Sequence, residues 1–164
     1  MTKPPKISLV LDRLRSAHNT GNIFRIAEAV GAEEIIACGY TPHPPHPKLA
    51  KTAMQADEMV PCRHFETSFE AVQQLRKDGY KQILAIETEE DAVDAWSKEY
   101  EFPLALILGN EALGISPETL EIVDGAVCLP MFGQKRSINV GNCAAAVIYS
   151  VIKYAQENNL MIEE

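Results

Sequence analysis

Short apolar runs alternate with amphipathic segments along this chain. The spacing of Ile23, Ile26, Ala27 and Val30 (i, i+3, i+4, i+7) predicts a helix over residues 20–31. Asn19 or Thr20 is the expected N-cap of that helix, and Gly31 is expected to end it. The apolar runs predict strands at 6–12, 33–40, 59–62, 81–87, 103–109 and 126–129.

Further helices are predicted between these strands. They lie at 48–56, 67–78, 92–98, just after Pro117, and from about 139 to 156. The segment 41–47 holds four prolines in seven residues and must be a loop, because proline cannot donate to a sheet ladder. Alternating strands and helices indicate a single α/β domain over residues 1–164, with a mainly parallel sheet flanked by helices.

The last predicted helix is apolar on all sides over its first half. The run CAAAVIYSVI (143–152) carries no polar face, so it must be covered from more than one direction. A homodimer interface is the economical explanation in so short a chain. A helix buried entirely inside the monomer is the alternative.

Charge argues against a simple electrostatic nucleic-acid binder. The 164 residues carry 15 basic and 23 acidic side chains, for a net charge of −8. The charge is uneven, however, because five basic residues face the single acid Asp12 within residues 1–25. A nucleic-acid partner therefore stays open.

The four cysteines show neither CxxC pairing nor a histidine at zinc-finger spacing, which predicts reduced thiols in a cytoplasmic protein. The start of the chain does not resemble a signal peptide, and the run 143–152 is about half the length that spans a bilayer. We expect no membrane association. We also expect no metal, because His43 and His46 on a proline-rich loop are too few ligands.

Three segments carry candidate chemistry. NTGNIFR (19–25) places Arg25 on the exposed helix face, and LILGNEALGIS (106–116) places Gly109 and Glu111 directly after a buried strand. LPMFGQKRSINV (129–140) sets Ser137 and Asn139 just before a helix. Taken alone, each segment also has an ordinary structural explanation. The first fits a surface arginine with a capping asparagine, the second a glycine-bearing turn, and the third a helix-capping loop. GNEALG matches neither the P-loop nor the GxGxxG pattern.

Together, and in this order, the three segments resemble the SpoU/TrmH-type RNA ribose methyltransferases of the SPOUT superfamily. The resemblance runs from about residue 7 to 154 and rests on NTGNIFR, ILGNEALG and LPMFGQKRSINV. Gly141 departs from the serine that many members carry there. The absence of room for an additional N-terminal RNA-binding domain suggests a minimal catalytic-domain form.

The resemblance implies a C-terminal deep trefoil knot, S-adenosylmethionine as cofactor, and a dimer with RNA lying across both subunits. It assigns cofactor contacts to Ile86, Gly109, Leu129, Met131, Ser137 and Ile138. It assigns the catalytic site to Arg25, Asn19, Glu111, Ser137 and Asn139.

The implied reaction is methyl transfer to a ribose 2′-hydroxyl of RNA, with tRNA favoured over rRNA. Arg25 is expected to act as an electrostatic clamp, because a guanidinium does not readily release a proton. An RNA-binding strip is predicted from seven basic residues: Arg13, Arg15, Arg25, Lys48, Lys51, Lys135 and Arg136. The acidic segment 87–101 is expected to face away from it. A non-catalytic or partner-dependent protein and a base methyltransferase are the alternatives.

Overall fold

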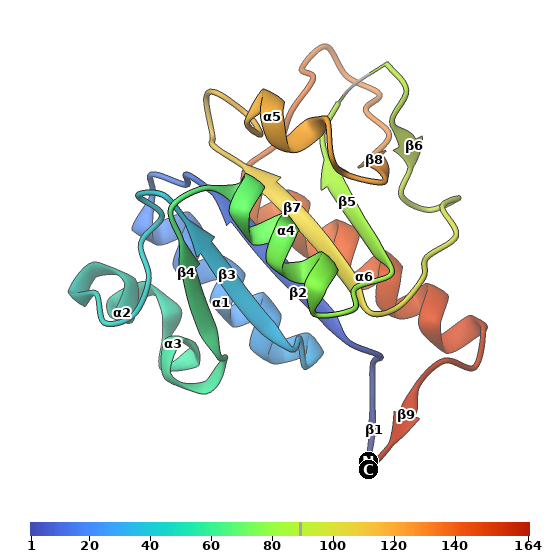
Figure 1. Ribbon diagram of the computed structural model, residues 1–164, viewed down its shortest axis with the longest axis horizontal. Helices are drawn as coiled ribbons and strands as arrows, with labels where there is room; N and C mark the ends of the chain where they lie inside the picture. The colour runs from blue at the N-terminus through green and yellow to red at the C-terminus, as the bar shows by residue number, and fades with distance from the viewer. Residues whose placement is uncertain (89) are drawn as a thin grey trace.

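A parallel sheet of seven strands forms the centre of the molecule. The computed structural model describes residues 1–88 and 90–164, and Figure 1 shows the strands crossing it diagonally. The strand order is β4-β3-β2-β7-β5-β8-β6, and every pairing in this sheet is parallel. The strands are β2 Ile7–Asp12, β3 Glu34–Cys38, β4 Cys62–Phe65, β5 Gln82–Ile86, β6 Val93–Asp94, β7 Leu104–Gly109 and β8 Gly125–Cys128. The predicted α/β class is confirmed.

Helices cover both faces of this sheet. They are α1 Ala17–Val30, α2 Pro47–Ala53, α3 Ala56–Met59, α4 Ser68–Lys77, α5 Pro117–Leu120 and α6 Val140–Glu157. In Figure 1, α1 and α6 lie behind the sheet and α4 lies in front of it. Alternation along β2 divides the core accordingly, since Leu9 and Leu11 join the cluster with α1 and α6, whereas Val10 joins the cluster with α4.

Helix α1 starts earlier than the apolar spacing predicts. Its N-cap is Ser16 rather than Asn19 or Thr20, and the Ser16 hydroxyl accepts a hydrogen bond from the Asn19 N–H at 3.1 Å. The Asn19 side chain instead faces other loops, as described below. Gly31 ends the helix as predicted, because it adopts the left-handed conformation with φ of 68°.

Two predicted elements differ from the observed ones. Residues 92–98 form strand β6 and turns instead of a helix, since Val93 and Asp94 pair with β8 and the Asp94 carboxylate accepts the Trp96 N–H at 2.8 Å. Strand β4 begins at Cys62, because α3 extends to Met59. No pattern in the sequence predicts the antiparallel pair β1 Thr2–Lys3 and β9 Ile162–Glu163, which joins the two ends of the chain.

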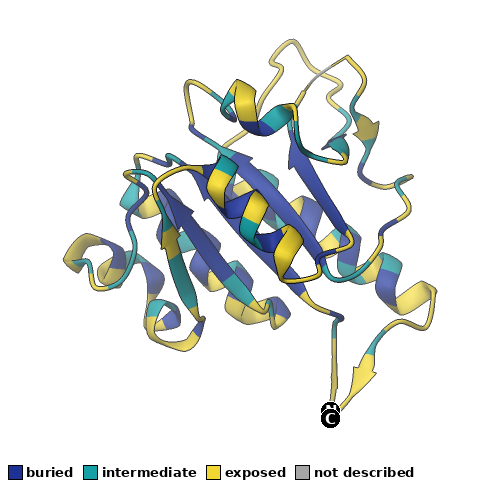
Figure 2. Cartoon of the chain, in the orientation of Figure 1, coloured by how far each residue is buried: buried dark blue, intermediate teal, exposed yellow. Residues whose placement is uncertain are grey.

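Helix α6 is covered on one side only. Val147, Ile148 and Val151 are fully buried, while Tyr149 on the opposite side is 53% exposed. Figure 2 shows buried and exposed residues alternating along this helix. The helix is therefore not enclosed within the monomer, so the alternative of a fully internal helix is wrong. The trefoil knot stays a prediction.

Candidate functional site

A cavity of about 300 Å³ lies at the carboxyl ends of β5, β7 and β8. This is the edge where α/β sheets commonly bind small molecules, and the volume is within the range of such sites. All six residues assigned to the cofactor line it: Ile86, Gly109, Leu129, Met131, Ser137 and Ile138. These six residues come from the end of β5, the end of β7 and the loop 129–138, and they converge on one cavity.

A chain of hydrogen bonds links the three segments at the cavity wall. The Asn139 side-chain amide donates to Asn19 Oδ1 at 3.0 Å, and the Asn19 amide donates to Glu111 Oε1 at 3.1 Å. All three residues line the cavity. Asn19 is the central member, and this contact explains why its side chain does not cap α1.

Glu111 anchors the start of α1 to the loop after β7. Its carboxylate accepts the Arg15 N–H at 3.0 Å and the Ser16 N–H at 3.1 Å, in addition to the Asn19 amide. Partial burial alone would raise the pKa of this carboxyl. The bonds from Arg15, Asn19 and Ser16 outweigh burial, so the pKa of Glu111 lies below its usual value. Glu111 is therefore an anionic acceptor that holds the site together.

The lowered pKa of Glu111 predicts a loss of stability in acid. A carboxyl with a lower pKa in the folded state stabilises the fold above its unfolded value of 4.5, and the contribution disappears as pH falls through the folded value. Glu111→Gln should thus lower the free energy of unfolding at pH 7, and this deficit should shrink toward about pH 3. Urea titrations of both proteins across this range measure it. A deficit independent of pH would contradict an ionised Glu111.

The loop after β7 closes tightly on itself. Asn110 and Gly114 exchange both backbone hydrogen bonds, at 3.1 and 3.0 Å, and Asn110 Oδ1 accepts the N–H groups of Ala112 and Leu113 at 2.8 and 2.9 Å. A Cβ atom on Gly109 would lie 2.4 Å from the Gly114 carbonyl carbon. The missing side chain of Gly109 therefore makes room for the backbone of its own loop, and not only for a ligand as the sequence suggested.

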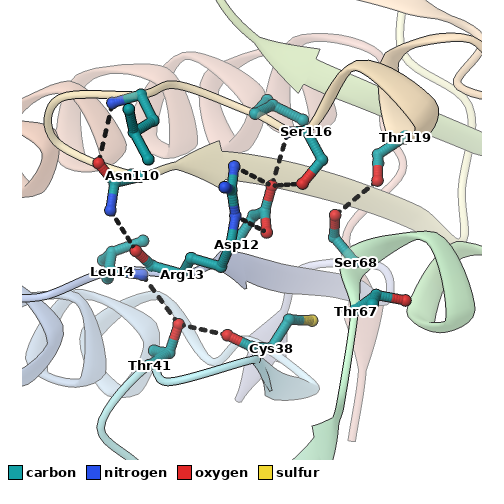
Figure 3. A network of polar contacts seen from close by, with 12 residues as sticks. Asp12, Arg13, Leu14, Cys38, Thr41, Thr67, Ser68, Asn110, Ser116 and Thr119 are labelled. Carbon is teal, nitrogen blue, oxygen red and sulfur yellow. Dashed lines mark hydrogen bonds and ion pairs between the residues drawn. The ribbon is translucent and has the colours of Figure 1, made fainter.

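A buried carboxylate secures the other side of this loop. Asp12 at the end of β2 is 1% exposed and accepts bonds from the Ser116 N–H at 2.8 Å, the Ser116 hydroxyl at 2.9 Å and Arg13 Nε at 3.0 Å (Figure 3). The bond to Asp12 raises the pKa of Arg13. Sequence reasoning missed Asp12 and Asn110, although a polar residue ending a buried strand was the available signal.

Asn139 caps helix α6 as well as contacting Asn19. Its Oδ1 accepts the N–H groups of Gly141 and Asn142 at 2.8 and 3.2 Å. A Cβ atom on Gly141 would lie 3.1 Å from this oxygen. The cap and the glycine that follows it are thus packed together, which gives Gly141 a structural role beside the cavity.

Removing the Asn139 cap should destabilise the protein. Asn139→Ala loses both the cap and the bond to Asn19, and we expect the free energy of unfolding to fall by about 1–2 kcal/mol. Asn139→Asp is the matched control, because it keeps the capping oxygen but cannot donate to Asn19 as a carboxylate. Thermal or urea unfolding of both variants separates the two roles. Equal stability of Asn139→Ala and the parent would refute the capping role.

A sequence profile of the SpoU rRNA Methylase family matches residues 6–149 of this chain. The chain belongs to the SpoU rRNA methylase family. The resemblance seen in the three segments is therefore confirmed.

Individual SpoU relatives agree with this assignment. The tRNA (guanosine(18)-2'-O)-methyltransferase of Escherichia coli K12 is 28% identical over 162 residues, covering 99% of this chain and 69% of the relative. The enzyme of the same name from Thermus thermophilus is 31% identical over 147 residues, covering 90% of this chain and 74% of the relative.

Solved structures of SpoU methylases share the fold. The A. aeolicus TrmH/SpoU tRNA modifying enzyme superposes with a TM-score of 0.84 at 22% identity, covering 96% of this chain and 79% of that one. The SpoU methyltransferase AviRb from Streptomyces viridochromogenes, in complex with the cofactor AdoMet, gives a TM-score of 0.82 at 25% identity. That match covers 92% of this chain and 58% of AviRb.

Arg25 lies apart from the cavity of this SpoU methylase. It is exposed on α1 and lines a different hollow together with Asn22, Gly141, Asn142 and Tyr149. Within a single chain, Arg25 therefore does not line the cavity with the other site residues, and its catalytic role stays a prediction. Helix geometry gives the reason, since Arg25 is six positions after Asn19 and the two side chains therefore leave α1 in different directions.

The basic residues of the predicted RNA-binding strip occupy different surroundings, and the strip stays a prediction. Arg136 lines the cavity, whereas Arg25 lines the hollow beside α6 and Arg13 is held against Asp12. Lys48, Lys51, Lys135 and Arg15 are exposed. The first part of the acidic segment 87–101 does not face away from all of these basic residues, because Glu87 and Thr88 line the same cavity as Arg136. Glu87 Oε1 also accepts the Ile115 N–H at 2.8 Å. Glu89 of that segment lies outside the described residues.

Cys143 also lines the cavity and was not among the predicted site residues. Burial raises its pKa to about 11, so the group is a neutral thiol near pH 7 and contributes apolar surface rather than a nucleophile. All four cysteines are free. Among residues 1–88 and 90–164, no three histidine, cysteine or acidic side chains gather as metal ligands do. No helix in these ranges is both long and apolar enough to cross a membrane.

Proposed function

We propose that this protein transfers the methyl group of S-adenosylmethionine to a ribose 2′-hydroxyl of RNA, with tRNA as the favoured substrate. The observation that carries the proposal is the cavity at which the three segments meet, tied together through Glu111, Asn19 and Asn139. The names of the two tRNA 2′-O-methyltransferase relatives support tRNA. A relative from Ralstonia nicotianae is named a 23S rRNA methyltransferase, so rRNA belongs in every test.

The cavity suits a nucleoside-containing cofactor. Leu129, Met131 and Ile138 give it apolar walls, and the backbone near Gly109, Leu129 and Ile138 is available to hold the adenine and ribose. S-adenosylmethionine supplies an electrophilic methyl group on a sulfonium when it is bound. Ser137 and Asn139 present short polar groups at the same cavity, where they would position the ribose of the RNA that receives the methyl group.

Arg25 is assigned to the reacting ribose and its neighbouring phosphate. A guanidinium does not readily release a proton, so Arg25 is not assigned as the base that removes the hydroxyl proton. It instead stabilises negative charge that develops on the 2′-oxygen and holds the adjacent phosphate, while the proton passes to water. Positioning of the two reacting groups then contributes the remaining rate enhancement.

The proposed active unit is a homodimer. Arg25 and Tyr149 line one hollow between α1 and the uncovered side of α6, where a second copy would bury exposed Met54 and Met59 as well. A two-fold contact at this hollow would cover α6. We assign the partner's Arg25 to the cavity, because Arg25 of the same chain does not line it. We further propose a cytoplasmic location, which the four free cysteines support.

Resistance to alkali tests ribose methylation against base methylation. Bulk tRNA or rRNA would be labelled with radioactive S-adenosylmethionine and the protein, and then hydrolysed in alkali. A 2′-O-methyl group removes the hydroxyl that attacks the neighbouring phosphate, so label should remain in dinucleotides. Label that appears only in mononucleotides would identify base methylation and overturn the proposal.

A further inference from the structure

Tyr40 is exposed beside the cavity, and its hydroxyl is hydrogen-bonded to the loop after β7. It lies two residues after β3 and is 53% exposed, although large aromatic side chains are usually buried. The Asn110 amide reaches its hydroxyl at 3.0 Å. Because Asn110 itself lines the cavity, Tyr40 adjoins the proposed site of methyl transfer.

The backbone on both sides of Tyr40 is also hydrogen-bonded. His64 Nε2 lies 2.8 Å from the Gly39 carbonyl oxygen, and His43 Nδ1 lies 3.1 Å from the Thr41 carbonyl oxygen. The two imidazole rings stack with centroids 4.3 Å apart. Both carbonyls that flank Tyr40 are therefore engaged by one stacked pair.

Thr41 fastens the same turn to the sheet. Its hydroxyl accepts the Leu14 N–H at 2.9 Å and lies 2.8 Å from the Cys38 carbonyl oxygen, while Asn110 donates to the Arg13 carbonyl at 2.6 Å (Figure 3). An exposed ring on so rigid a base loses little conformational freedom when another planar group stacks on it.

A cation accompanies the ring. The Arg15 guanidinium carbon lies 6.0 Å from the centroid of Tyr40, and the Arg15 N–H is bound to Glu111 at the cavity. An aromatic face with an adjoining guanidinium matches an unpaired nucleotide, whose base stacks and whose phosphate is anionic.

We infer that Tyr40 and Arg15 form a stacking platform for an unpaired base of the RNA, next to the nucleotide that is methylated. This inference rests on the proposed function and adds residues that specify how RNA is held. It also accounts for RNA binding by a chain with net charge −8, because stacking does not depend on counterion release.

Binding of bulk tRNA, taken from a strain lacking this protein, tests the platform. Filter binding at about 50 and 200 mM salt would compare Tyr40→Ala, Tyr40→Phe and a matched control. We expect Tyr40→Ala to raise the Kd about tenfold at both salt concentrations, since one stacked base is lost but no charge. Tyr40→Phe keeps the ring and should stay within about threefold of the parent.

Trp96→Ala is the matched control. Trp96 is 65% exposed and follows β6, at the opposite edge of the sheet from the β3–β4 side, so its loss should leave tRNA binding unchanged. S-adenosylmethionine affinity, measured by calorimetry, should be the same in all variants. Irradiation at 254 nm should also cross-link tRNA to the peptide that contains Tyr40.

Three results would overturn the inference while the proposed function stands. They are parent-like tRNA binding by Tyr40→Ala, equal losses in Tyr40→Ala and Tyr40→Phe, and weaker S-adenosylmethionine binding in Tyr40→Ala. The last two would mean that Tyr40 only supports the Asn110 loop. If the parent protein binds neither tRNA nor rRNA, the proposed function fails and the platform with it.

Discussion

Replacing Arg25 with alanine should reduce the rate of methyl transfer by about 10²-fold or more, while S-adenosylmethionine affinity stays near that of the parent. The affinity should persist because Arg25 lines the hollow beside α6 and not the cavity assigned to the cofactor. The rate should fall because the negative charge that develops on the reacting oxygen would lose the guanidinium proposed to stabilise it. Single-turnover kinetics and calorimetry measure the two quantities. Equal loss of both would contradict this role for Arg25.

Mixed dimers decide whether Arg25 acts across the subunit interface. One chain would carry Arg25→Ala and the other Ile138→Asp, which places a charge in the apolar wall of the cavity. If each site combines one cavity with the partner's Arg25, random mixing should restore about a quarter of the parent activity. If Arg25 serves the cavity of its own chain, the mixture should stay inactive. Arg25→Lys serves as the control that keeps the charge but loses the planar fork.

Gly109→Ala should disrupt both the loop after β7 and cofactor binding. The added Cβ would lie 2.4 Å from the Gly114 carbonyl carbon and 2.5 Å from the Ile115 nitrogen, so one backbone segment must move. We expect a loss of about 1–3 kcal/mol in the free energy of unfolding and at least about a tenfold loss of S-adenosylmethionine affinity, because Gly109 and Gly114 both line the cavity.

Gly133→Ala is the matched control for Gly109→Ala. The same methyl group at Gly133 meets no described atom within 4 Å, so stability and cofactor affinity should both stay close to the parent values. Urea unfolding and calorimetry compare the three proteins. If Gly109→Ala kept the stability and the cofactor affinity of the parent, the loop after β7 would be able to move aside without cost. The argument for a rigid cavity edge would then fail.

The sequence predicts the fold well where periodicity is strong. Strand β7 and the end of α1 at Gly31 follow directly from apolar runs and from the left-handed conformation that glycine tolerates. The failures have local causes. Strand β6 is two residues long and exists only because β8 lies beside it, so no repeat in the sequence marks it. Ser16 is the N-cap of α1, because the Asn19 side chain is hydrogen-bonded to Glu111 in the loop after β7.

The sequence predicts which residues belong to the candidate site, but it does not predict how they are placed relative to one another. The three segments identify the residues that meet at the cavity, because the carboxyl ends of parallel strands share one edge. Nothing in the sequence spacing reveals that Arg25 faces the α6 side, or that Arg13 pairs with Asp12. Those outcomes depend on which loops fold back on one another, as the Asn110–Gly114 loop does.

Transfer of radiolabelled methyl groups from S-adenosylmethionine tests the central claim most directly. Bulk tRNA and rRNA from a strain lacking this protein would be incubated with it and digested to nucleosides. We predict label in 2′-O-methylated nucleosides of tRNA, incorporated about 10²-fold or more slowly with Arg25→Ala. An absence of label from both RNA classes, with S-adenosylmethionine binding intact, would contradict the account and favour a non-catalytic or partner-dependent role.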